Sequence, residues 1–238
     1  MKGIIGGILL KKLDEAMIDE SIFVIVSLRN HAGPSLNEVE RFDLVKLNFR
    51  AGIKASKNAA FDTAAVYFQA ARELLGSQGW VIDPELTIRL YSAEAHARFV
   101  IGELEIMESL VGEILSKDIP VEDKFQVYET KILEAMSGNR FDEALSTALY
   151  VRKQLGFNPI PTRVTKIKII IEYMKTNRAL KGLTTEDIIA LPDLTDERIV
   201  MGQRIMELVS CQSCWCIIKY APDSQPKFHL VLLLHNSS

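Results

Sequence analysis

The chain has 238 residues, of which 48% are hydrophobic and 25% are charged, and its formal net charge is -3. This composition is typical of a soluble globular protein and argues against a disordered chain. The pI is near 5.9, which argues against a nucleic-acid-binding surface, because such surfaces carry an excess of lysine and arginine.

The N-terminus and the cysteines indicate where the protein works. The apolar run over residues 3–10 is short for a signal peptide, and a lysine pair closes it without a small-residue cleavage site. A membrane span needs about 20 apolar residues, and no stretch supplies them. All three cysteines, Cys211, Cys214 and Cys216, lie in one short segment, unlike a secreted disulfide framework. We therefore expect a cytoplasmic protein without a membrane span.

In chain order, apolar periodicity and breaks predict a succession of helices. Residues 8–28 fit one or two short helices, and Gly33 with Pro34 marks a break. A helix over about 38–57 follows, and apolar and small residues at helical spacing predict another over residues 59–75. Residues 76–84 are expected to form a loop. We interpret its Trp80 as a plug over the helices rather than as a platform for a ligand.

A ridge of apolar and small residues occurs three times. Phe61, Leu104 and Phe141 each begin the second helix of a predicted hairpin, at spacings of 43 and 37 residues, which are periods of helical repeats. The turns before two of these helices contain Gly102-Glu103 and Gly138-Asn139. We expect the ridges to be buried; their further members are Ala64, Phe68, Ala71, Met107, Val111, Ile114, Ala144, Ala148 and Val151. Helices should also approach closely at the small residues Gly52 and Ala95, whose counterpart in the third hairpin is Ile132.

This pattern resembles tetratricopeptide repeats (TPR). It predicts an all-α fold, and the resemblance implies a TPR-like right-handed solenoid of helical hairpins over residues 37–210. Residues 1–36 would form an N-terminal helical cap or linker, and residues 211–238 an irregular apolar tail, of either a complete protein or a truncated gene product.

The fourth predicted unit is irregular. Residues 162–180 predict a basic amphipathic helix with Ile171 and Met174 facing inward. Such a helix could meet acidic lipid or an acidic partner, but acidic residues that follow at once favour pairing within the chain. A helix over about 195–210 begins at Thr195, a good N-cap residue.

The tail contains a combination that could bind a metal. Cys211, Cys214 and Cys216 with His229 and His235 are residue types that ligate zinc. Their spacing does not pair the ligands across a turn, so buried free thiols are favoured.

Signals for catalysis are weak along the whole chain. No histidine stands in a recognisable nucleophile setting, and we expect His96, beside Glu94, to be solvated or hydrogen-bonded. Glu103 and Glu105 stand at a hairpin turn, which predicts a wet surface. The N-terminal GIIGG lacks the lysine and hydroxyl residue of a phosphate-binding loop. We therefore assign no catalytic, cofactor-binding or metal-binding residues and expect no cofactor.

A longer resemblance covers most of the chain, from Ile5 to about Met206. It rests on stretches such as LNFRAGIKASKNAAFDTAAVYFQAARELL, AEAHARFVIGELEIMESL, EDKFQVYETKI and LYVRKQLGFNPIP. The chain resembles the helical, TPR-like region downstream of the AAA-type ATPase module in large predicted-ATPase signalling proteins, many of which also carry protein-kinase, GAF or histidine-kinase domains. The resemblance implies that nucleotide chemistry resides in modules outside this chain.

Three functional hypotheses follow. The first is a non-enzymatic scaffold that binds protein, with ATPase or kinase modules as partners, or relays state between such modules. The second is a regulatory subunit that acts in trans on a separate ATPase or kinase. The third, a zinc-binding module, rests only on the Cys/His tail.

Overall fold

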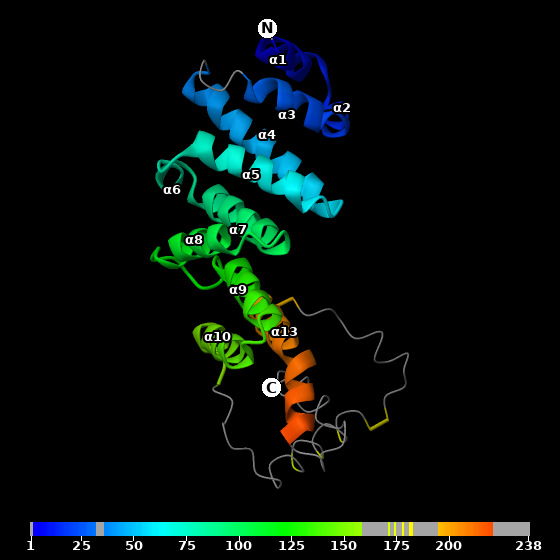
Figure 1. The fold of residues 1–238 in the computed structure, drawn as a ribbon, viewed down its shortest axis with the longest axis vertical. Helices are drawn as coiled ribbons and strands as arrows, with labels where there is room; N and C mark the ends of the chain where they lie inside the picture. Colours follow the sequence, from blue (N-terminus) through cyan, green and yellow to red (C-terminus); the bar gives the residue numbers. More distant parts are fainter. Residues whose placement is uncertain are drawn as a thin grey trace. The chain divides into compact units, whose positions relative to one another are not determined.

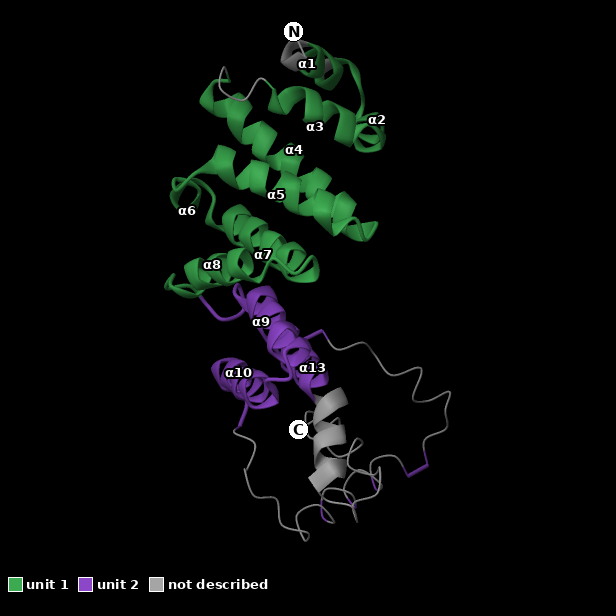
Figure 2. Cartoon of the chain, in the orientation of Figure 1, with its two compact units in different colours: residues 1–119 green, residues 120–238 purple. Residues whose placement is uncertain are grey.

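The structure is a computed structural model, and it describes residues 2–31, 36–158 and 195–220, with isolated positions between 171 and 182. Throughout these residues the regular secondary structure is helical, so the predicted all-α class is confirmed. The chain forms two compact units, residues 1–119 and 120–238 (Figure 2). The basic helix predicted for residues 162–180 lies largely outside the described residues. Its Ile171 and Met174, which we expected to face inward, are exposed.

Unit 1 is built from eight described helices (Figure 1). They are α1 (Lys2–Lys12), α2 (Glu15–Glu20), α3 (Ile22–Asn30), α4 (Glu38–Lys57), α5 (Phe61–Leu75), α6 (Gly79–Ile82), α7 (Pro84–Val100) and α8 (Leu104–Leu115). Along the chain, α3 packs on α4, α4 on α5, α5 on α7 and α7 on α8. The N-terminal segment thus holds three helices where one or two were predicted, and the predicted loop over residues 76–84 contains the short α6.

Local sequence signals explain where the longer helices begin. At α4, the Asn37 side chain accepts from the Glu40 amide (2.9 Å), and the Glu40 carboxylate accepts from the Asn37 amide (3.3 Å), which forms a capping box. At α7, the Asp83 carboxylate accepts from the Leu86 amide (2.9 Å), and Pro84 occupies the first turn. At the other end of α4, Lys54 and Lys57 in the last turn place positive charge beside the negative end of the helix dipole, which is favourable.

The three hairpins share one turn geometry. Ala59, Gly102 and Asn139 all have positive φ, at 56°, 80° and 60°. The amide of the next residue donates across each turn: Ala60 to the Ala55 carbonyl, Glu103 to Arg98 and Arg140 to Ala135, at 2.8–2.9 Å. This is the 6→1 bond of a Schellman motif. Phe61, Leu104 and Phe141 each begin a helix directly after one of these turns, as predicted.

The shared turn geometry predicts that substitutions at Ala59 and Gly102 change the free energy of unfolding in opposite directions. Ala59 holds a left-handed conformation that a Cβ disfavours, so Ala59→Gly should raise the free energy of unfolding by about 0.5 to 1 kcal/mol. Gly102→Ala should lower it by about 1 kcal/mol, because a Cβ there meets no neighbouring atom and only the backbone is strained. Urea unfolding followed by circular dichroism measures both. Equal effects at the two sites would contradict the shared turn geometry.

The core of unit 1 lies between α4, α5 and α7. Its centre is Phe68, which is fully buried and packs against Phe49 with ring centroids 5.9 Å apart. A Cβ at Gly52 would overlap the Phe68 ring, so the expected close approach at this small residue is confirmed. A second cluster, formed by Ile18, Ile22, Ile25, Val26, Leu47 and Ala51, joins α2 and α3 to α4.

The ridges are buried except at their first members. The nine further members named above are all buried. Phe61 and Phe141 are half-buried, and Leu104 is 41% exposed; each is the first residue of its helix, directly after the hairpin turn. Ala95, where close approach was predicted, and its counterpart Ile132 are both fully buried.

Unit 2 contains α9 (Phe125–Ser137), α10 (Phe141–Gln154) and α13 (Glu197–Tyr220), each of which contacts the other two. Val127, Ile132, Ala148, Val151 and Ile205 are fully buried in it. Ion pairs join Arg198 to Glu122 (3.1 Å) and Arg204 to Glu129. Helix α13 continues to Tyr220, whereas we predicted a helix that ends near 210 and an irregular tail.

Candidate functional site

The residues considered for zinc do not form a described site. Cys211, Cys214 and Cys216 lie in α13, but their side chains are outside the described residues, as are His229 and His235 altogether. Where the structure does describe side chains, no group of three His, Cys, Asp or Glu residues could hold a metal ion. The zinc hypothesis therefore gains no support.

The two described histidines have different environments. His31 is exposed, and its Nδ1 donates to the Ser27 carbonyl oxygen (2.7 Å). His96 is half-buried between two aromatic rings, with centroids 6.0 Å from Phe61 and 6.4 Å from Phe99. We expected a solvated or hydrogen-bonded His96, and the structure instead places its ring in an apolar contact. Burial lowers the pKa of His96 from its ordinary value of 6.5.

This burial predicts a pH dependence of stability. Because the folded-state pKa of His96 lies below its unfolded value, the unfolded chain binds the proton more tightly, and stability is lost as pH falls below 6.5. We expect the urea midpoint of the wild type to decrease between about pH 7.5 and about pH 5.5 more than that of His96→Gln. Equal slopes for wild type and His96→Gln would contradict the assignment.

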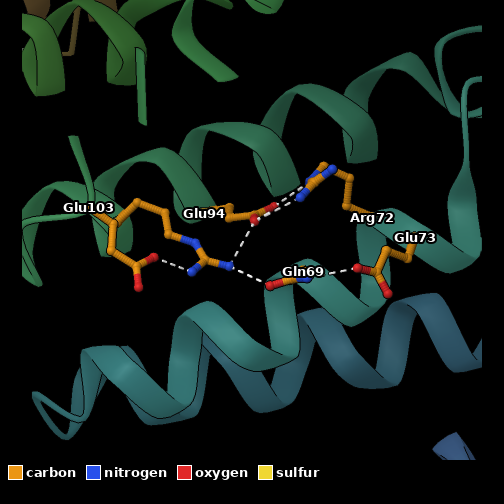
Figure 3. A network of polar contacts seen from close by, with 6 residues as sticks. Gln69, Arg72, Glu73, Glu94 and Glu103 are labelled. Atoms are coloured by element: carbon orange, nitrogen blue, oxygen red, sulfur yellow. Dashed lines mark hydrogen bonds and ion pairs between the residues drawn. The ribbon is translucent and has the colours of Figure 1, made fainter. Parts of the chain in front are cut away.

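A network of polar and charged side chains lies at the interface of α5 and α7, around Glu94 (Figure 3). Glu94 is 0% exposed, and its two carboxylate oxygens accept from Arg72 Nε (2.7 Å) and Arg72 Nη2 (3.2 Å). Arg98 Nη2 also donates to Glu94 Oε1 (3.4 Å). Hydrogen bonding to Glu94 raises the pKa of Arg72.

The network continues outward from Arg98 and ends at the surface. Arg98 donates to the Gln69 side-chain oxygen (2.6 Å) and pairs with Glu103, and Gln69 Nε2 donates to Glu73 (2.7 Å). Glu103 and Glu105 are exposed, as the predicted wet surface requires. Because Glu94 is enclosed and doubly paired with arginine, no substrate could reach it, and the network serves to fix α5 against α7.

Trp80 occupies the position predicted for a plug. Its ring packs against Tyr91 with centroids 5.3 Å apart, and its Nε1 donates to Glu113 (2.8 Å). The Lys117 ammonium lies 4.7 Å from the ring centroid. The side chain is half-buried and links α6 to α7 and α8, so its contacts are with the protein itself.

Among the described residues, a concave surface on unit 1 offers a candidate site for binding. It encloses about 340 Å³ and is lined by Asp19 of α2, by Phe49, Arg50, Ile53, Lys54 and Lys57 of α4, and by Arg89 of α7. We call it the basic groove, because four cationic side chains and one carboxylate line it. Its floor is apolar, formed by the buried Phe49 and the half-buried Ile53.

The cations of the basic groove differ in how far they are neutralised. Arg50 donates to Asp19 (2.6 Å) and to Glu15 (3.0 Å). Lys54 donates to the Asp19 carbonyl oxygen and lies 5.7 Å from the Phe23 ring centroid, so no carboxylate neutralises it through these contacts. Arg89 lies over the Phe49 ring at 5.4 Å and pairs only loosely with Glu85 (3.8 Å).

Sequence reasoning missed this groove, although part of its signal is readable. Arg50, Lys54 and Lys57 follow at four- and three-residue steps, which place them on one face of α4. The contribution of Arg89 could not be read, because it depends on how α7 packs beside α4.

Comparison with known proteins gives one distant relative. Hybrid signal transduction histidine kinase G of Dictyostelium discoideum is 25% identical over 152 residues, which cover 60% of this chain and 4% of the kinase. No family model matches the chain, and no solved structure matches it. The similarity connects the chain to signalling proteins and concerns a small part of that kinase.

Over the part of the chain that the structure describes, no helix is both long enough and apolar enough to cross a bilayer.

Proposed function

We propose that this chain is a non-enzymatic scaffold that binds protein and connects or regulates the modules of an ATPase-type signalling protein. The observation that carries the proposal is the basic groove on a framework of helical hairpins. The enclosed carboxylate Glu94 lies elsewhere, and it pairs with Arg72 between two helices. The distant similarity to a histidine kinase supports a signalling role. The partners proposed are ATPase or kinase modules.

The proposal includes a finer architecture and a cellular location. The hairpins of residues 37–210 would belong to a TPR-like right-handed solenoid capped by residues 1–36, and the protein would work in the cytoplasm. The recurrence of one Schellman turn at Ala59, Gly102 and Asn139 supports a repeat. In such architectures each hairpin packs on its neighbours and the concave face binds partners.

An alternative is a regulatory subunit that acts in trans on a separate ATPase or kinase. Co-purification tests both: the full chain is mixed with a purified ATPase or kinase module from the same organism and passed over a sizing column. We expect a complex, and module activity measured with and without the chain separates passive binding from regulation. ATP turnover by the chain alone that survives repurification would contradict a non-enzymatic role.

A further inference from the structure

The basic groove has the chemistry to select one kind of partner. We propose that it binds an acidic peptide segment of a partner protein, with carboxylates on Lys54, Lys57 and Arg89 and an apolar side chain on the floor. The inference rests on the proposed protein-binding function and specifies its ligand. All the lining residues belong to unit 1.

Charge complementarity supports an anionic ligand. Asp19 and Glu15 already hold Arg50, which fixes this side chain as part of the groove wall. Lys57 is exposed in the last turn of α4, and Arg89 is also exposed. The full positive charges of Lys57 and Arg89 outweigh the partial negative charge, about half an elementary charge, at the C-terminus of α4. An incoming carboxylate would therefore meet a net positive surface.

The size and floor of the groove favour side chains of a peptide. Its 340 Å³ lies at the small end of the range of about 300 to 1,000 Å³ for ligand pockets. The half-buried Ile53 offers an apolar surface between the cations, and the Arg89 guanidinium is held over the buried Phe49 ring by a cation–π contact. A leucine-sized side chain flanked by acidic residues would match this pattern.

The rim argues against a continuous polyanion. Glu15 and Asp19 pair with Arg50, Glu85 lies 3.8 Å from Arg89, and the net charge of the chain is negative. A nucleic-acid backbone would bring its closely spaced phosphates against these carboxylates, whereas separate acidic side chains can be placed on the cations alone.

Fluorescence anisotropy with the full chain tests the proposal. The ligand is a short fluorescein-labelled peptide in which glutamates flank one central leucine. We expect saturable binding that weakens about three- to fivefold in Lys57→Gln or Arg89→Gln, and about tenfold or more in the double variant. Lys153→Gln on α10 removes the same charge from an exposed site outside the groove, and it should bind like the wild type. Higher ionic strength should weaken binding.

Three results would overturn the proposal. They are equal binding of a peptide with glutamine in place of glutamate, wild-type affinity in the double variant, and tighter binding of a single-stranded oligonucleotide than of the acidic peptide. Circular dichroism of each variant establishes that the fold is retained. If the peptide fails to bind while a partner module still forms a complex with the chain, only the groove assignment fails. If both fail, the proposed function itself fails.

Discussion

Replacing Phe68 with alanine should lower the free energy of unfolding by about 3 to 5 kcal/mol, the range measured for buried aromatic side chains. Phe68 is 0% exposed, and its ring fills the space that Gly52 leaves open on α4. Truncation would create a cavity between α4 and α5 that these two closely packed helices could close only in part. Urea unfolding followed by far-ultraviolet circular dichroism measures the effect.

A matched control lies on the same helix. Val66 is exposed on α5, so Val66→Ala should change stability by less than about 0.5 kcal/mol. Phe61→Ala, at a half-buried position, should cost less than Phe68→Ala. Ala64 is fully buried, and Ala64→Leu should cost about 1 to 3 kcal/mol by overpacking. If Phe68→Ala unfolded with the same urea midpoint as the wild type, the core would be centred elsewhere.

The second large effect is expected at Glu94. Glu94→Gln removes the negative charge that compensates Arg72 and Arg98, and it leaves the buried Arg98 guanidinium without its internal counter-ion. Breaking a buried pair in this way costs about 3 to 5 kcal/mol. Glu103 still contacts Arg98 from the surface, so the lower end of the range is expected. Urea unfolding again provides the measurement.

The control for Glu94 is another glutamate of α7. Glu85 is exposed, and its contact with Arg89 is 3.8 Å long, so Glu85→Gln should change stability by less than about 0.5 kcal/mol. A double-mutant cycle that combines Glu94→Gln with Arg72→Gln should give a coupling energy of about 0.5 to 3 kcal/mol. Additive effects of the two substitutions would contradict a direct role of the Arg72–Glu94 pair in holding α5 against α7.

Helix starts and buried ridges could be predicted because their signals are local. The steps from Phe61 to Ala64, Phe68 and Ala71 follow the helical period, and the structure buries the last three. The exposure of Leu104 could not be predicted, since periodicity identifies a face of the helix and not the point at which the neighbouring helix ends. Hairpin turns at Gly102 and Asn139 were readable from residue type, whereas the same conformation at Ala59 was not.

The polar network and the basic groove depend on tertiary packing. Arg72 and Glu94 are 22 residues apart in the chain, and no local pattern pairs them. In the sequence nothing distinguishes Glu94 from other glutamates in helices, and only the packing of α5 on α7 encloses it. Likewise, the arginine and lysines of α4 could be placed on one face, but their meeting with Asp19 and Arg89 required the structure.

The central claim is that the chain acts by binding protein, and calorimetric titration of the full chain with a purified ATPase or kinase module tests it most directly. We expect a saturable heat of binding that is weakened in the Lys57→Gln/Arg89→Gln double variant and unchanged in Lys153→Gln. The absence of binding to every such module would contradict the account.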